Sequence, residues 1–332
     1  MKKHEITGYY GNNNFGDDLF VEILKGYLEK ANTECLVDLY NENFIQRLLN
    51  KLKRLSTVES VTLGGGSILG TSGKFGVRRL EASLKGLLRY KYCAIGVGIE
   101  NLNYIPETYL NKFDFLGIRS KKDLDLIKKV SPNAFYTSDL AYSYKNIFDQ
   151  YVLKNIKDNE IGIVLTDTGL IGQNINSTLV IEKMILVLKD IFPSYHFNIY
   201  SFQPSRMQDN IVISQFEKYL LNNNVSYSVF EHVNVHTTIS HLQKNKFVVT
   251  DRLHAGILCH IMEIPFLLST HHSKCVDYLD DIDYFTNSFD LESFNEKLVF
   301  NAINWCNSDR NTLALHEQTS VNAIKKWLSF IE

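Results

Sequence analysis

The amino-acid sequence predicts an α/β protein built of two domains, and three observations lead to this prediction. The chain has 332 residues, which is longer than one hydrophobic core usually supports. Short apolar segments alternate with amphipathic ones, the pattern of parallel β-α-β units. This alternation stops in the polar and charged residues 142–159 and then starts again.

In the first half, apolar segments that predict strands are separated by amphipathic segments that predict helices. The expected strands are residues 4–10, 34–40, 60–63, 92–97, 113–118 and 134–137, and the expected helices are residues 17–30, 44–55, 79–90 and 121–129.

The second half repeats the pattern and closes with one amphipathic helix over residues 313–331. The expected strands are residues 161–166, 197–202, 226–230, 247–250 and 265–269, and the expected helices are residues 177–191, 209–222, 235–244 and 254–262. We therefore predict Rossmann-like domains at residues 1–145 and 146–312, with a C-terminal helix at 313–332. Because ligands of open α/β sheets bind at the carboxyl ends of the strands, two such domains predict a cleft between them.

Composition excludes several classes of protein. The formal net charge of −2 argues against general nucleic-acid binding, and no apolar run is long enough to predict a membrane span. The first residues, MKKHEITGYYGNNN, lack the apolar core of a signal peptide. Five cysteines without a CxxC pair are expected to be reduced thiols of a cytoplasmic protein.

Glycine-rich segments follow three of the predicted strands. The first, GYYGNNNFGDD, offers Gly11, Asn14 and Asp17 as candidates for holding an anion or a sugar oxygen, or forms only a helix-capping turn. The second, GGGSILG, lets the backbone at Gly65 and Gly66 approach a ligand closely. It lacks the Lys-Ser/Thr of a phosphate-binding P-loop. The third is GVGIE.

Cationic side chains follow other predicted strands. Arg119 in GIRS suits a bidentate grip on a carboxylate or phosphate, although a surface salt bridge is the plainer interpretation. In TDRLHAG, Arg252 and His254 stand where a strand gives way to a helix, so an anion site and a proton-transfer group coincide. Lys274 adds a cation, while His271 and His272 lack metal-ligand spacing and are expected to be loop residues.

Together these motifs resemble the polysaccharide pyruvyl transferase family, through GNNNFGDD, GGGSILG, GVGIE, GIRS, SDLAY and TDRLHAGI followed by IPFLL and Lys274. The resemblance implies a GT-B-like pair of Rossmann-like domains and phosphoenolpyruvate as donor, with no metal or other cofactor. It implies that the C-terminal domain binds the donor and the N-terminal domain the saccharide acceptor. By the same resemblance, Arg119, Arg252 and Lys274 bind substrate together with Leu253, and His254 is catalytic.

The expected reaction is transfer of an enolpyruvyl unit to a sugar as a ketal, with His254 as general acid. Asp17, Asp18 and Asp139 are candidates for the general base. One alternative is a GT-B-like glycosyltransferase that uses a nucleotide-sugar, for which the acidic residues 277–283 would bind the ribose. Another is a non-catalytic sugar-binding protein.

Two predicted helices carry many cations. Their basic residues are Arg47, Lys51, Lys53 and Arg54 in the first and Arg78, Arg79, Lys85, Arg89 and Lys91 in or beside the second. They form either a solvated face of a helix that packs on its sheet or a surface for anionic lipid at the inner face of the membrane. The acceptor is free, nucleotide-linked or lipid-linked, and lipid contact would suit the last of these.

Overall fold

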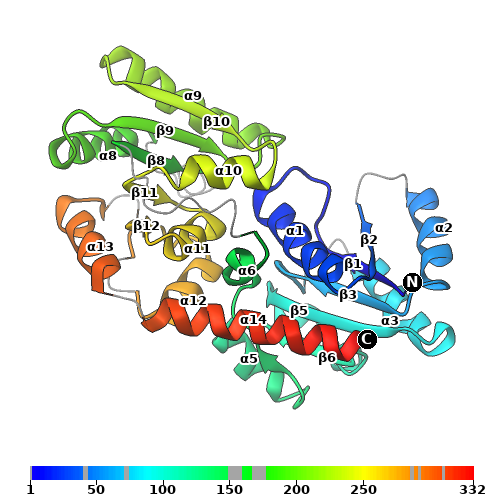
Figure 1. Ribbon diagram of the computed structural model, residues 1–332. Helices are drawn as coiled ribbons and strands as arrows, with labels where there is room; N and C mark the ends of the chain where they lie inside the picture. The colour runs from blue at the N-terminus through cyan, green and yellow to red at the C-terminus, as the bar shows by residue number, and fades with distance from the viewer. Residues whose placement is uncertain are drawn as a thin grey trace. The chain divides into compact units, whose positions relative to one another are not determined.

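A computed structural model describes residues 2–39, 44–70, 75–148, 159–166, 177–284, 288–290, 293–308 and 311–332. The chain divides into two compact units (Figure 1). Unit 1 comprises Met1–Asn12, Gly16–Ile147 and Leu315–Glu332, and unit 2 comprises Asn13–Phe15 and Phe148–Ala314. Part of the polar segment at residues 142–159 lies outside the described residues.

Unit 1 contains a parallel sheet whose described strands run in the order β2-β1-β3-β5-β6-β7, with β4 paired to β5. The strands are β1 (Lys3–Thr7), β2 (Glu34–Asp38), β3 (Ser60–Gly64), β4 (Ser67–Leu69), β5 (Lys91–Ile99), β6 (Phe115–Ile118) and β7 (Phe135–Tyr136). The central strands are buried along nearly their whole length, as their continuous apolar sequences require in a sheet covered on both faces.

The helices of unit 1 connect these strands and end with a helix from the far end of the chain. They are α1 (Phe15–Lys30), α2 (Phe44–Leu55), α3 (Phe75–Leu88), η1 (Leu102–Tyr104), α4 (Glu107–Leu110), α5 (Lys121–Lys128), η2 (Leu140–Ser143), α6 (Tyr144–Phe148) and α14 (Asn311–Ile331). In Figure 1, α14 runs along β5 and β6. Buried Trp327 fixes it there by donating to Thr62 Oγ1 at 3.1 Å, and the Phe330 ring packs on Phe115.

Unit 2 contains a second parallel sheet, with its described strands in the order β10-β9-β8-β11-β12. Its strands are β8 (Glu160–Val164), β9 (His196–Ser201), β10 (Tyr227–Glu231), β11 (Phe247–Thr250) and β12 (Phe266–Leu268), and its helices are α8 (Ser177–Ile191), α9 (Met207–Asn222), α10 (Val235–Leu242), α11 (Leu253–Ile261), α12 (Ser273–Asp281) and α13 (Glu296–Ser308). The strand order reverses between β8 and β11, and ligands of such sheets bind beside this point.

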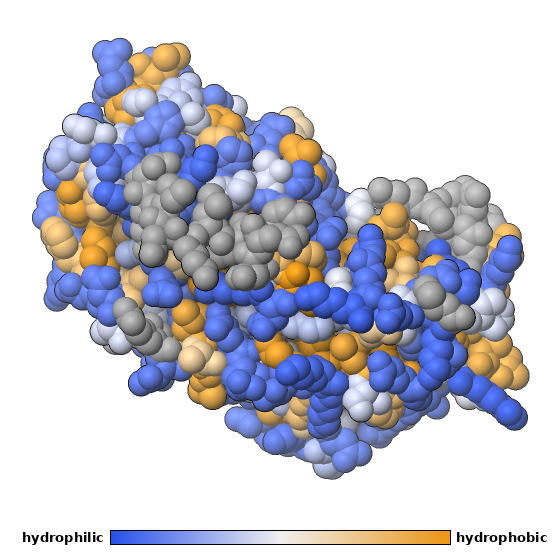
Figure 2. All heavy atoms as spheres, in the orientation of Figure 1, coloured by the Kyte–Doolittle hydropathy of each residue, from blue (hydrophilic) through white to orange (hydrophobic). Residues whose placement is uncertain are grey.

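The prediction of two Rossmann-like α/β units is confirmed. In the surface view of Figure 2, hydrophobic residues form groups interspersed with hydrophilic ones. Among the described helices, none combines the length and the hydropathy that crossing a bilayer demands.

Candidate active site

Arg119 is a buried cation of unit 1. It follows β6, and the next residue, Ser120, caps α5 by accepting from the N–H of Asp123. The Arg119 side chain donates from Nη1 to Asp139 Oδ2 at 3.3 Å and from Nη2 to Ser67 Oγ at 3.0 Å. Only 9% of Arg119 is exposed, so it is largely buried and does not lie on the surface. Asp139 is thus an ion-pair partner and helix cap.

Two glycines make room for this arginine and for an aspartate of α1. A Cβ atom on Gly98 would lie 2.9 Å from Arg119 Nη2, and one on Gly66 would lie 3.5 Å from Asp17 Oδ1. Gly98 N donates to Gly66 O at 2.9 Å, which joins the two positions. Arg119, Asp17, Gly66 and neighbouring Gly65 therefore gather at the carboxyl ends of β3, β5 and β6, as predicted from their strand ends.

The N-terminal glycine-rich segment is divided between the units. Gly11, with φ +82°, and Asp17 belong to unit 1, whereas Asn14 lies in the short piece that belongs to unit 2. Within unit 2, the Phe15 ring packs on Phe202 with centroids 4.5 Å apart, and Phe15 N donates to Phe202 O at 2.9 Å. Asp17 and Asp18 lie inside the first turn of α1 rather than before it.

Arg252 is the corresponding cation of unit 2. It is the N-cap residue of α11 and makes no side-chain capping bond. Its Nη2 donates to Asp209 Oδ2, a carboxylate in the first turn of α9 that is 2% exposed. The neighbouring α12 also begins without a side-chain cap bond, at His272. Helix N-termini of this kind attract anions, because their first N–H groups carry partial positive charge.

Asp251 directly precedes Arg252 in the chain and is 1% exposed. Its Oδ2 accepts from Thr166 N and Thr166 Oγ1, both at 2.8 Å, which ties β11 to the end of β8. Burial raises the pKa of this carboxyl to about 6, against the opposing effect of Arg252. Asp251 is therefore a structural anchor of the Arg252 loop.

Two histidines lie in the electrostatic field of several cations. The rings of His271 and His272 are 4.0 Å apart. Burial, then the charges of His272, Lys274 and Arg252, lower the pKa of His271 to about 3. Burial, then Lys274, Arg252 and Arg206, lower the pKa of His272 to about 4. Both imidazoles are thus neutral near pH 7, and Arg252 and Lys274 lie near enough to act electrostatically on both of them.

The other residues predicted for this motif lie on or beside α11. His254 is half-buried in the first turn of α11, two residues after Arg252. Leu253 is 4% exposed and packs inward, so only its backbone is placed to meet a ligand. Lys274 is exposed near the start of α12. The structure therefore places Arg252, Leu253, His254 and Lys274 in one unit, at the carboxyl ends of adjacent strands.

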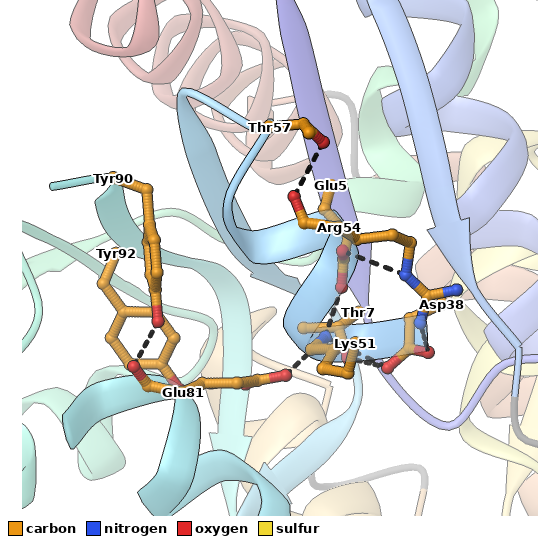
Figure 3. A network of polar contacts seen from close by, with 9 residues as sticks. All are labelled: Glu5, Thr7, Asp38, Lys51, Arg54, Thr57, Glu81, Tyr90 and Tyr92. Carbon is orange, nitrogen blue, oxygen red and sulfur yellow. Dashed lines mark hydrogen bonds and ion pairs between the residues drawn. The ribbon is translucent and has the colours of Figure 1, made fainter. Parts of the chain in front are cut away.

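A separate ion cluster lies inside unit 1, and Figure 3 shows Lys51 pointing between three carboxylates. Lys51, which is 1% exposed, contacts Glu5 and lies 3.1 Å from Asp38 Oδ2 and 2.5 Å from Glu81 Oε1. Arg54 adds contacts to Glu5 at 3.3 Å and to Asp38 at 2.7 Å. Burial alone would lower the pKa of the Lys51 ammonium, but the three carboxylates outweigh it and raise that pKa.

This cluster changes the interpretation of the two basic helices. Among the described residues, the carboxylates of Glu5, Asp38 and Glu81 are the one acidic group close enough to share a metal ion, and Lys51 already supplies the cation there. The prediction that Lys51 lies on a solvated face is wrong, because Lys51 is buried. On the same helix it is the apolar Leu49 that is exposed, to 62%. The side chains of Arg47, Arg78 and Arg79 lie outside the described residues.

Three polar residues of the site were missed in the sequence: Asp209, Arg206 and Ser67. Asp209 is the first residue of a predicted helix and follows Arg206 by three positions. An acidic residue at this place indicates the start of a helix and not a binding site. The contact of Asp209 with Arg252 joins residues 43 positions apart, so no local pattern reveals it.

The fold is shared with several nucleotide-sugar proteins at low sequence identity. The UDP-GlcNAc 2-epimerase from Methanocaldococcus jannaschii is 10% identical with a TM-score of 0.65, covering 99% of this chain and 100% of that one. A putative UDP-N-acetylglucosamine 2-epimerase from Listeria monocytogenes is 10% identical with a TM-score of 0.65, covering 100% and 96%. An alpha-glucosyltransferase in complex with UDP-glucose and DNA is 10% identical with a TM-score of 0.51, covering 100% and 99%. The likeness establishes a GT-B-like fold.

No curated protein matches the chain. A family model does: the polysaccharide pyruvyl transferase model matches residues 14–273, a region that contains Asp17, Arg119, Arg252 and His254 and ends one residue before Lys274. With most of its length matched, this chain belongs to the polysaccharide pyruvyl transferase family.

Proposed function

We propose that the protein transfers the enolpyruvyl unit of phosphoenolpyruvate to a saccharide of a surface polysaccharide or its precursor, forming a pyruvate ketal. The observation that carries the proposal is that Arg252 and Lys274 stand at the N-termini of α11 and α12, two helices that follow adjacent strands and begin without a side-chain cap bond. Phosphoenolpyruvate has a carboxylate and a phosphate, so it needs several cations and N–H donors at once.

In this proposal Arg119 and Arg252 bind the donor as guanidinium groups, and Lys274 acts as a point charge. Each arginine already has a carboxylate partner that fixes its orientation, Asp139 for Arg119 and Asp209 for Arg252. A guanidinium has five N–H donors, so each retains donors for a ligand after making these contacts. The backbone at Leu253 adds the helix N-terminus.

His254 is the proposed general acid. Protonation of C3 of phosphoenolpyruvate turns the methylene into a methyl group and leaves a cation-like centre at C2. Two acceptor hydroxyls then form C–O bonds to C2 while the bond from C2 to the phosphate oxygen breaks. Of the two hydroxyl protons, one balances the proton gained by C3 and the other leaves with inorganic phosphate. Water and cofactor are not consumed.

The acceptor is proposed to bind in unit 1, where Gly11, Gly65, Gly66 and Asp17 follow the ends of the strands. Asn14, from the same glycine-rich segment, stays a predicted acceptor contact. Asp17 is the preferred candidate for the general base. Its carboxylate lies in the first turn of α1, and its Oδ1 would be 3.5 Å from a Cβ atom on Gly66, as would Ile68 Cγ2. Asp139 is a weaker candidate because it is buried and committed to Arg119.

A glycosyltransferase or epimerase that uses a nucleotide-sugar is the second candidate. The solved structures that share this fold include an epimerase in complex with UDP-GlcNAc and UDP and a glucosyltransferase in complex with UDP-glucose. In this chain α12, directly after β12, carries Asp277 and Asp281 on one face, where a ribose could be bound. Non-catalytic sugar binding would be seen as affinity for saccharides without release of phosphate.

Thermal denaturation with different donors separates these functions. A ligand at about 100 times its dissociation constant adds about 2.7 kcal/mol to the free energy of unfolding. We expect phosphoenolpyruvate to raise the melting temperature and UDP-GlcNAc, UDP-glucose and GDP-mannose to leave it unchanged. The reverse pattern would support the nucleotide-sugar function, and an Arg252→Met variant controls for weak binding elsewhere.

We further propose that the protein is cytoplasmic and contacts the inner face of the membrane when its acceptor is lipid-linked. The cytoplasmic location agrees with the state of the thiols: burial raises the pKa of Cys35 and Cys93 to about 12, which keeps them reduced and unreactive. Exposed Leu49, Leu52 and Leu87 on α2 and α3 are the best candidates for lipid contact. Flotation with anionic but not with neutral vesicles is the expected result, and no flotation with either would exclude the contact.

A further inference from the structure

A buried histidine of the C-terminal helix contacts the segment that holds Arg119. His316 of α14 is 2% exposed, and its Nδ1 lies 2.7 Å from Ser138 Oγ. Its ring stacks on Tyr142, with centroids 5.1 Å apart and planes at 25°. Tyr136 Oη lies 3.4 Å from the same Nδ1, so three residues hold the imidazole, and the shortest contact of its Nδ1 is with Ser138.

Ser138 has an unusual backbone conformation. Its φ is +58°, in the left-handed region that residues with a side chain rarely adopt. It is 1% exposed, and Thr137 Oγ1 donates to its carbonyl at 2.8 Å. Such a conformation persists only where the surroundings hold it, and such residues cluster at functional sites.

The next residue connects this conformation to the site. Asp139 Oδ1 accepts from Ala141 N at 3.0 Å, which starts η2, and its Oδ2 accepts from Arg119 Nη1 at 3.3 Å. Because Ser138 sets the direction in which the chain enters Asp139, a change in the Ser138 backbone would move this carboxylate away from Arg119.

We propose that His316 is a positioning residue for the Arg119 site: it holds Ser138 in the left-handed conformation and thereby fixes Asp139 against Arg119. In this proposal α14 both packs on the sheet and supplies His316, on which the position of the Arg119 side chain depends. The effect on KM for phosphoenolpyruvate rests on the proposed donor-binding role of Arg119, whereas the effect on the Asp139 turn does not.

Three variants test the proposal: His316→Ala, Ser138→Gly and the two combined. Hydrogen exchange of the Ala141 amide reports on the Asp139 turn without any substrate, and KM for phosphoenolpyruvate reports on Arg119. In His316→Ala we expect exchange and KM to rise about tenfold, the effect of losing about one hydrogen bond. Because glycine adopts a positive φ without strain, the double variant should return both values toward wild type.

The matched control is Ile324→Ala, a buried residue of the same helix. It should lower the melting temperature without changing the exchange of Ala141 or KM. Unchanged exchange at Ala141 in His316→Ala, or a double variant as impaired as His316→Ala, would overturn the proposal. If exchange rises and is restored while KM stays constant, His316 positions the turn as proposed and the donor-binding role of Arg119 is wrong.

Discussion

His254 is the residue on which the proposed chemistry depends most. It lies in the first turn of α11, beside the Arg252 that is proposed to bind the donor. We predict that His254→Ala keeps its fold and lowers kcat by about 10²–10⁴-fold, the usual contribution of a general acid. Steady-state kinetics with a circular-dichroism melting curve checks this. His260→Gln, on the same helix but buried, should change stability and not turnover; near wild-type kcat in His254→Ala would remove it from the mechanism.

Asp209 is predicted to act through Arg252. Its carboxylate is buried and holds the guanidinium, so Asp209→Asn removes a charge-assisted hydrogen bond while keeping the shape of the side chain. Such bonds contribute about 1.5–3 kcal/mol. We therefore expect KM for phosphoenolpyruvate to rise about 10- to 100-fold, with a smaller change in kcat. Ser214→Ala, on the exposed side of the same helix, is the control. An unchanged KM would show that Arg252 needs no such partner.

The titrating groups of unit 2 predict how stability responds to acid. His271 and His272 have pKa values below the ordinary 6.5, so the unfolded chain binds more protons and the free energy of unfolding falls as pH drops below about 6.5. Asp251 has the opposite sign: its raised pKa makes the folded chain bind more protons between its ordinary 3.8 and about 6, so its effect weakens stability as pH rises through that window.

The measurement is urea denaturation at pH 5 and pH 7. We expect His271→Gln/His272→Gln to lose less stability than wild type on going to pH 5, and Asp251→Asn to lose more. Equal pH dependence in all three proteins would contradict the assignment of these protonation states.

At the scale of elements, the ion cluster of Lys51 joins α2 and α3 to the first two strands. Three buried carboxylates and two cations leave the cluster sensitive to loss of either cation. Removing one partner of a buried ion pair costs about 3–5 kcal/mol. We predict a loss of that size in Lys51→Met, measured by chemical denaturation, and a change within about 0.5 kcal/mol in exposed Lys53→Met. Equal effects would mean that the cluster does not stabilise unit 1.

Most long periodic elements could be read from the sequence, although the 13-residue helix α13 was not predicted, and the short ones could not be read. The predicted helices at residues 44–55 and 177–191 and the strand at 247–250 coincide with α2, α8 and β11, because each has one clear apolar pattern. The three-residue β4 and the four-residue α4 carry too few positions for a pattern. Helix α12 was not predicted, although Cys275, Tyr278 and Leu279 form a buried stripe.

The site residues divide in the same way. Arg119, Arg252 and Gly66 were predictable because parallel strands bring their carboxyl ends to one edge of a sheet. The burial of Lys51 was not predicted, because Lys51 is one of several cations on its helix. Its partners Glu5, Asp38 and Glu81 lie on other elements and come near it only in the folded chain. The partners Asp209 and His316 lie 43 and 178 residues from Arg252 and Ser138 in the chain, a distance that no local pattern spans.

At the scale of the whole molecule, fold and family give different information. A GT-B-like fold at 10% identity is shared with epimerases and a glucosyltransferase, so the fold alone does not choose a donor. The family match over residues 14–273 does favour a pyruvyl transferase. It ends before α13 and α14, yet α14 belongs with unit 1 and contributes His316.

The most direct test of the proposed function is to incubate the protein with phosphoenolpyruvate and a panel of free, nucleotide-linked and lipid-linked saccharides, measuring inorganic phosphate and the product by NMR. We predict that phosphate appears only with a matching acceptor, in a one-to-one ratio to a new ketal methyl group, and that His254→Ala abolishes both signals. Consumption of a nucleotide-sugar without release of phosphate from phosphoenolpyruvate would contradict the account.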